Sequence, residues 1–170
     1  MDRIVIVPRW SGDASSDWYP WLRGKVAAPV EIASLLPSKD APEIAACIDD
    51  VTPLLDETVT LIGHSVGAQV AMRALAQSGV RVPHLLLVAG WWTVDKPWDA
   101  IRPWIDTPFD ESAVHADRVT VLLSDDDPFT ADHAETRRLF ESRLGAKVEL
   151  CAGARHFNNA EEPAVLTALA

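Results

Sequence analysis

Short apolar runs that alternate with helix-like stretches constrain the fold of this chain more than any other feature. The runs are nearly continuous and rich in branched side chains, which is typical of strands buried on both faces of a parallel sheet. Four of them are strong and cover residues 4–7, 59–62, 85–89 and 119–123. Two weaker candidates, at 30–35 and 147–150, bring the expected number of strands to about six.

Helix-like stretches separate these runs from one end of the chain to the other. They cover residues 18–25, 42–55, 66–78, 131–144 and 161–170. Gly79 and Gly145 follow two of them, where a left-handed residue ends a helix, and Thr130 or Asp132 can cap the helix that comes after. The alternation predicts an α/β fold, a three-layer sandwich with helices on both faces of a mostly parallel sheet.

Bulk properties limit the possible partners. A chain of 170 residues with 48% hydrophobic content suits one domain over residues 1–170. No leader-like segment and no apolar run of about 18 residues is present, so we expect a soluble, cytoplasmic protein. The formal net charge of −10 disfavours nucleic acid and anionic membranes as partners. Cys47 and Cys151 lack metal-ligand spacing and are expected to be buried free thiols.

The motif GHSVG at residues 63–67 is the first candidate for chemistry. Its glycine-serine-glycine spacing arises by chance in about one of twenty chains of this length, so its context matters more. A predicted strand precedes it and a helical pattern follows, which favours a sharp turn that exposes Ser65 at the carboxyl end of the sheet. Ser65 is then a nucleophile, and the Val66 N–H is a donor to an oxyanion. The alternative is that Ser65 is only a turn residue.

A serine hydroxyl needs a base to take its proton, and the chain has five histidines. We interpret His64 as a packing residue of the turn. His84 precedes a strand at the wrong end of the sheet, and His115 and His133 fall in connecting or helical stretches. His156 follows the last predicted strand, at the carboxyl edge, and is the candidate base. The alternative is an ordinary surface-loop histidine.

The run SDDDPF supplies the candidate acid that would orient this imidazole. It follows the strand that ends at residue 123 and offers Asp125, Asp126 and Asp127. Pro128 restricts the backbone of the residue before it, so we select Asp127 and expect its two neighbours to face water. The order Ser, Asp, His is the order found on α/β-hydrolase folds. The alternative is that all three are solvated turn carboxylates.

Together these motifs resemble those of the small, lidless serine hydrolases typified by retinoblastoma-binding protein 9 and its bacterial relatives. The resemblance runs nearly end to end and rests on five segments: IVIVPRW, DWYPWL, GHSVG, SDDDPF and RHFN. It implies a minimal α/β-hydrolase fold without a cap domain, with six strands in the order 2-1-3-4-5-6 and a triad of Ser65, Asp127 and His156. The Leu-x-Cys-x-Glu motif of the animal member is absent, so no protein partner is implied.

Two positions depart from the family pattern. Relatives usually carry glycine after the first strand and before the triad histidine, where this chain has Arg9 and Arg155. By analogy, the backbone N–H of Trp10 joins that of Val66 in the oxyanion hole, and a side chain at Arg9 could change the path of that loop. Two alternatives stay open for Arg9: it points to solvent, or it binds a substrate anion.

Aromatic residues should line the substrate pocket. Two of the seven tryptophans directly follow a predicted strand, and the long irregular segment 90–112 is expected to form a rim over the site. An apolar pocket near Ser65 is expected from Trp10, Trp91, Trp92, Phe129 and Phe157.

The leading hypothesis is a serine hydrolase, carboxylesterase-like, that acts on a small ester or related acyl substrate through an acyl-enzyme. Amide and thioester substrates stay open, and so does the choice between monomer and homodimer. No metal or organic cofactor is needed. A rival hypothesis is a binding protein that keeps the scaffold without turnover. A flavodoxin-like ligand domain shares the alternation but gives no reason for Asp127 and His156 to occur where they do.

Overall fold

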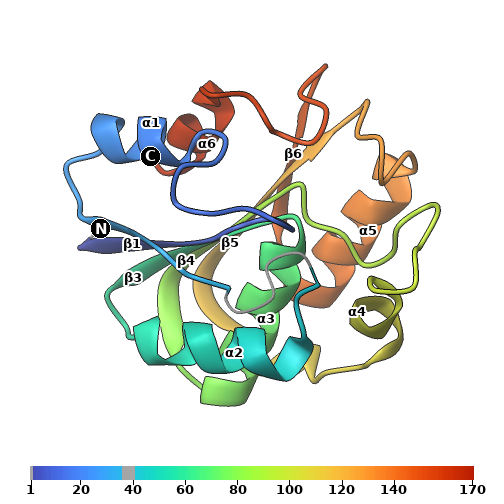
Figure 1. The fold of residues 1–170 in the computed structure, drawn as a ribbon, viewed down its shortest axis with the longest axis horizontal. Coiled ribbons are helices and arrows are strands. Elements are labelled where there is room, and N and C mark those ends of the chain that lie inside the picture. The colour runs from blue at the N-terminus through green and yellow to red at the C-terminus, as the bar shows by residue number, and fades with distance from the viewer. Residues whose placement is uncertain (1, 36–40) are drawn as a thin grey trace.

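The protein is built around a fully parallel sheet of six strands, in the order β2-β1-β3-β4-β5-β6 (Figure 1). A computed structural model describes residues 2–35 and 41–170. The strands are β1 (Arg3–Val7), β2 (Val30–Ile32), β3 (Val59–His64), β4 (Arg81–Val88), β5 (His115–Ser124) and β6 (Lys147–Cys151). The predicted α/β architecture and strand order are confirmed.

The strand starts differ from the prediction. β4 begins at Arg81 and β5 at His115, four residues before the expected starts, and β2 ends at Ile32 rather than at residue 35. In β5 the first five residues are half-buried or exposed and the last five are buried. Only the buried half carries the apolar pattern that marks a strand in the sequence, because a solvent-facing segment needs no apolar residues.

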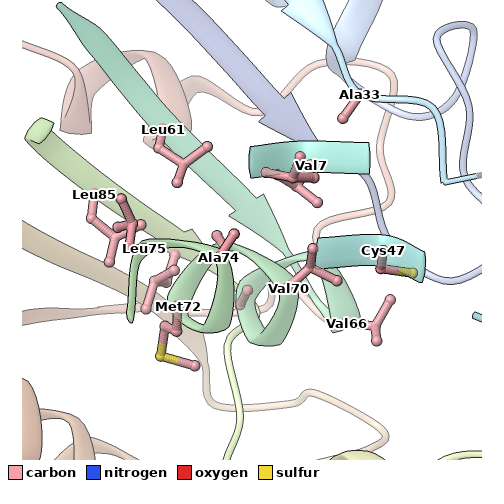
Figure 2. Close-up of a cluster of buried hydrophobic side chains, with 14 of the residues drawn as sticks. Val7, Ala33, Cys47, Leu61, Val66, Val70, Met72, Ala74, Leu75 and Leu85 are labelled. Carbon is pink, nitrogen blue, oxygen red and sulfur yellow. The ribbon is translucent and has the colours of Figure 1, made fainter. Parts of the chain in front are cut away.

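Side chains of successive strand residues alternate between two hydrophobic cores. In β1, Val5 and Val7 belong to one core, and Ile4 and Ile6 to the other. Figure 2 shows part of the first core, in which Val7 and strand leucines lie near Val70 and other side chains of the helix after β3. The sheet is thus buried on both faces.

Helices pack on both faces of the sheet and form the two outer layers of the sandwich (Figure 1). The first core lies under α2 (Ile44–Val51), α3 (Val66–Ser78), α4 (Arg102–Asp106) and α5 (His133–Leu144). The second core lies under α1 (Tyr19–Lys25) and α6 (Pro163–Ala168). Within the described ranges, no further helical domain covers the carboxyl edge of the sheet.

Helix ends follow the expected chemistry at most positions. Gly79 and Gly145 adopt left-handed φ values of 68° and 61° and end α3 and α5. Asp132 caps α5, since its carboxylate accepts a hydrogen bond from the Glu135 N–H. The helix expected over 42–55 is shorter: α2 spans Ile44–Val51 and continues as the 3-10 turn η1 (Thr52–Leu54), whose proline cannot donate a helical hydrogen bond.

Segment 89–114 links the end of β4 to the start of β5 and contacts α3. It contains α4 and the 3-10 turn η2 (Glu111–Ala113). The buried Arg73 of α3 anchors it, donating hydrogen bonds to the carbonyl oxygens of Trp104 and Thr107 at 3.0 and 2.7 Å. Its guanidinium also stacks on the Phe109 ring. These contacts fix the path of the segment along α3.

Among the described residues, no helix combines the length and apolar character that a membrane crossing requires. Cys47 and Cys151 are both free, as predicted; Cys47 is buried, whereas Cys151 is only partly so.

Candidate active site

Ser65 occupies a sharp turn between β3 and α3. Its φ of 57° and ψ of −118° are unfavourable for a residue with a side chain. A Cβ atom on Gly63 would lie 2.6 Å from the Ala68 Cα atom, and one on Gly67 would overlap the Val7 carbonyl oxygen. The Ser65 N–H donates to the Val88 carbonyl oxygen of β4 at 2.9 Å. The strand–turn–helix context expected for the motif is present, and both glycines are needed for it.

Ser65, His156 and Asp127 form one hydrogen-bonded line. His156 Nε2 lies 2.9 Å from Ser65 Oγ, and His156 Nδ1 lies 2.8 Å from Asp127 Oδ2. The second carboxylate oxygen of Asp127 accepts from the Phe129 N–H at 2.9 Å. A carboxylate can only accept, so Nδ1 carries the proton and Nε2 is free to accept from the serine hydroxyl. All three residues are at most 8% exposed.

The two aspartates before Asp127 are exposed, as predicted, and each also accepts a backbone hydrogen bond. Asp125 accepts from the Gly153 N–H at 2.8 Å, and Asp126 accepts from the Arg155 N–H at 2.7 Å. Hydrogen bonds from the Ser124 hydroxyl and then the Arg155 N–H lower the pKa of Asp126. Both carboxylates therefore tie the loop before His156 to the end of β5.

His64 packs within the turn, as interpreted, and it also makes two hydrogen bonds. Its Nδ1 lies 2.8 Å from the Tyr19 hydroxyl, and its Nε2 lies 2.9 Å from the His156 carbonyl oxygen. Burial lowers the pKa of His64 to about 3, with the adjacent His156 contributing in the same direction. His64 is therefore neutral at physiological pH.

The remaining histidines lie away from Ser65, but two of their assignments were wrong. His84 lies inside β4 rather than before it, with its ring nitrogens 3.0 Å from the Thr120 hydroxyl and from an Arg118 nitrogen. His115 begins β5 instead of occupying a connection, and His133 begins α5.

The Arg9 side chain does not simply point to solvent, and its binding of a substrate anion stays a prediction. Its Nε and Nη2 atoms bind the two carboxylate oxygens of Asp17 at 2.7 and 3.2 Å, and its Nη1 donates to the Trp10 carbonyl oxygen at 2.8 Å. The Asp17 side chain is only 5% exposed. The guanidinium thus neutralises a buried carboxylate of its own loop, which composition and local pattern do not reveal.

A cavity of about 220 Å³ opens beside Ser65 and His156. Its walls are largely apolar and aromatic. Arg9, Trp10, Val66, Trp91 and Phe129, all expected at the site, line it. Four further lining residues, Val94, Trp98, Ile101 and Asn158, were not assigned to the pocket from the sequence. The first three lie in the long segment expected to form a rim, and their apolar character there was the available signal.

Two residues expected in the pocket are not among those that line it. Trp92 points away from the cavity and packs against Phe109 and Phe140. Phe157 is fully buried in the second core, with α1 and α6. Phe157 itself has a left-handed φ of 54°, and its side chain lies in the core instead of facing the cavity. The prediction that Trp92 and Phe157 line the pocket was wrong. Each is next to a lining residue in the chain, but its side chain packs elsewhere.

Arg155 has a φ of 49°, a left-handed conformation that glycine adopts at less cost. This explains why a glycine suits the position before the histidine. The structure accommodates the arginine, whose N–H binds Asp126.

No group of three or more His, Cys, Asp or Glu side chains suited to a metal ion occurs among the residues described.

A parallel sheet with a serine on a sharp turn at its carboxyl edge defines an α/β-hydrolase type of protein. The model of the serine hydrolase family matches residues 4–164, and the chain belongs to this family. No curated protein sequence matches the chain. The narrower resemblance to the retinoblastoma-binding protein 9 group stays a prediction.

Solved structures show the same fold. The ydeN gene product of B. subtilis has a TM-score of 0.89 at 18% identity, over 99% of this chain and 97% of that one. The carboxylesterase CesB (YbfK) from Bacillus subtilis has a TM-score of 0.61 at 15% identity, over 99% and 82%. Est1E from Butyrivibrio proteoclasticus, solved with ferulic acid bound, has a TM-score of 0.69 at 15% identity, over 99% and 86%.

Proposed function

We propose that the protein hydrolyses a small ester or related acyl substrate through an acyl-enzyme on Ser65. The observation that carries the proposal is the line of hydrogen bonds from Asp127 through His156 to the Ser65 hydroxyl. It supplies a nucleophile, a base and a group that holds the base in the required tautomer.

The chemistry runs in two halves. Ser65 Oγ attacks the substrate carbonyl carbon while His156 Nε2 takes the hydroxyl proton, and the carbonyl oxygen becomes an oxyanion. When the tetrahedral intermediate collapses, the bond to the leaving group breaks and His156 gives its proton to that group. Water then attacks the acyl-enzyme with His156 again as the base, and the carboxylic acid leaves as Ser65 regains its proton.

The oxyanion needs preorganised donors, and we assign the backbone N–H groups of Val66 and Trp10 to this role. Val66 is the first residue of α3, where the helix dipole favours negative charge. Both residues line the cavity beside Ser65. Removing one such donor typically costs about 100- to 1,000-fold in turnover, so their placement decides the rate.

The walls of the cavity favour an apolar or aromatic acyl group. Trp91, Val94, Trp98 and Ile101 offer it contact area but no charge. The carboxylesterase CesB and Est1E, which binds ferulic acid, share the fold and support an ester of this kind. Two free cysteines fit a reducing compartment, and we propose a cytoplasmic location.

A fluorophosphonate, which phosphonylates activated serines, tests the proposal by intact mass. We expect one adduct on the wild type and on Ser15→Ala, a variant at an exposed serine, and none on Ser65→Ala. Hydrolysis of 4-nitrophenyl butyrate should follow the same pattern. A folded wild type that takes no adduct and cleaves no ester would contradict the proposal and favour the non-catalytic binding protein.

A further inference from the structure

The segment DWYPWL has no role in the proposed mechanism, although its first three residues are among the most buried near the site. Trp18 and Tyr19 are fully buried, and the Asp17 side chain is 5% exposed. None of the three lines the cavity. We call residues 17–19 the clamp, because each of them hydrogen-bonds to a loop that borders Ser65.

Tyr19 connects the two loops through His64. Its hydroxyl oxygen accepts from the Arg9 N–H at 3.1 Å and lies 2.8 Å from His64 Nδ1. His64 Nε2 faces the His156 carbonyl oxygen at 2.9 Å and must be the protonated nitrogen. Nδ1 is therefore an acceptor, and the tyrosine hydroxyl donates to it. An ordered chain of three hydrogen bonds runs from the loop after β1 to the backbone of His156.

Trp18 and Asp17 add parallel links. Trp18 Nε1 donates to the Phe157 carbonyl oxygen at 3.1 Å. One carboxylate oxygen of Asp17 accepts both from the Arg9 guanidinium and from the Asn158 side-chain amide, each at 3.2 Å. Residues 9 and 156–158, far apart in the chain, are thus held by three consecutive residues.

The histidine loop needs such support. His156 lies between Arg155 and Phe157, whose φ values of 49° and 54° are both left-handed. Each such conformation is unfavourable for a residue with a side chain, and it persists only where the surroundings hold it. Trp18 binds the Phe157 carbonyl oxygen directly, and Tyr19 reaches the His156 carbonyl oxygen through His64.

We propose that the clamp is a positioning device: it fixes the distance between the oxyanion loop at Arg9 and Trp10 and the imidazole of His156. This inference rests on the proposed hydrolase function. The two loops act on opposite parts of the same transition state, since one stabilises the oxyanion and the other protonates the leaving group. A shift of about 1 Å in such groups can cost up to about 100-fold in rate.

The test removes the Tyr19 hydroxyl in Tyr19→Phe, which keeps the ring. Two butyrate esters serve as probes, one with the good leaving group 4-nitrophenolate and one with the poor leaving group ethanol. An ethoxide must be protonated by His156 as it leaves, whereas nitrophenolate leaves without help. We expect kcat/KM to fall about 10- to 100-fold for the ethyl ester and clearly less for the nitrophenyl ester.

Trp21→Phe is the matched control. Trp21 lies on the same helix, and its buried Nε1 makes no hydrogen bond among the residues described. It should lower the melting temperature without changing the ratio of kcat/KM for the two esters. If the clamp only stabilised the fold, Tyr19→Phe would also leave the ratio of kcat/KM for the two esters unchanged. The same ratio in Tyr19→Phe and Trp21→Phe would therefore overturn the proposal.

A second variant guards against loss of folding. If Tyr19→Phe does not give a native circular dichroism spectrum, Trp18→Phe, which removes the donor to Phe157 together with part of the buried ring, is judged by the same ratio. Unfolding of both would show that the clamp stabilises the fold instead of positioning the site, and would overturn the proposal too. A wild type inactive on both esters refutes the hydrolase function itself, whereas an active wild type with an insensitive clamp refutes only the clamp.

Discussion

Gly67 lies directly against Val7, so closely that a Cβ atom on the glycine would overlap the valine carbonyl oxygen. Neither partner can move easily, because Val7 is fixed in β1 by its pairing with β3 and Gly67 is fixed in the first turn of α3. We therefore expect Gly67→Ala to lower the free energy of unfolding by about 2 kcal/mol or more, measured by urea denaturation.

Gly24→Ala is the control for this substitution. Gly24 lies in α1, where a new Cβ would meet no atom within 4 Å. Alanine is the better helix former, so this variant should be about 0.5–1 kcal/mol more stable than the wild type. Equal effects of the two substitutions would show that the contact with Val7 does not constrain the turn.

Asp127→Asn should reduce ester turnover by a factor on the order of 10,000 without unfolding the protein. The asparagine can still accept from the Phe129 N–H, but its amide group facing His156 Nδ1 favours the wrong tautomer. Asp125→Asn is the matched control, since it keeps an acceptor for the Gly153 N–H and does not contact His156. Steady-state kinetics of both variants tests the assignment. Comparable losses of turnover in the two variants would show that Asp127 has no role in the reaction that Asp125 lacks.

Stability should fall as the pH drops from about 6.5 toward 4, through the buried His84. Burial, and then the Arg118 charge, lower the pKa of His84 from 6.5 to about 4. In this window the unfolded chain binds a proton that the folded chain does not, so acid favours unfolding. Urea titrations at several pH values should give a shallower slope for His84→Gln, by at most about 1.4 kcal/mol per pH unit. Parallel curves for the two proteins would contradict this account.

The Cys47 thiol should resist alkylation in the native protein. Burial raises its pKa to about 12, with Asp50 and Glu43 adding to the effect. Only about one thiol in ten thousand is then ionised at pH 8, and the thiolate is the reactive form. In Cys151→Ser, iodoacetamide should add no mass without urea and one group with urea. Rapid native labelling would mean that α2 opens readily.

The architecture could be predicted from the sequence because strands buried on both faces must be apolar along their length. The same reasoning missed the first halves of β4 and β5, where charged residues such as Arg81 and Asp117 face solvent. Hydropathy identifies only the buried part of a strand, whereas backbone hydrogen bonding between strands continues into the part that faces solvent.

The candidate site was predictable only in part. Ser65, Asp127 and His156 each follow a predicted strand, and strand ends meet at one edge, so their order along the chain located them. The orientation of neighbouring side chains did not follow from that order: Trp91 lines the cavity, and Trp92 packs behind it. The contact of Tyr19 with His64 joins residues 45 positions apart and depends on how α1 docks, which no local pattern encodes.

The side chains proposed to react come from residues 65, 127 and 156, which follow β3, β5 and β6 respectively. No fragment that stops short of β6 contains all three, and their alignment requires the whole register of the sheet from β3 onward. Under the proposed function, covalent capture of Ser65 would therefore report tertiary structure as well as chemistry. A serine-directed probe becomes a sensor of the native population, able to count folded molecules in a mixture where spectroscopy gives only an average.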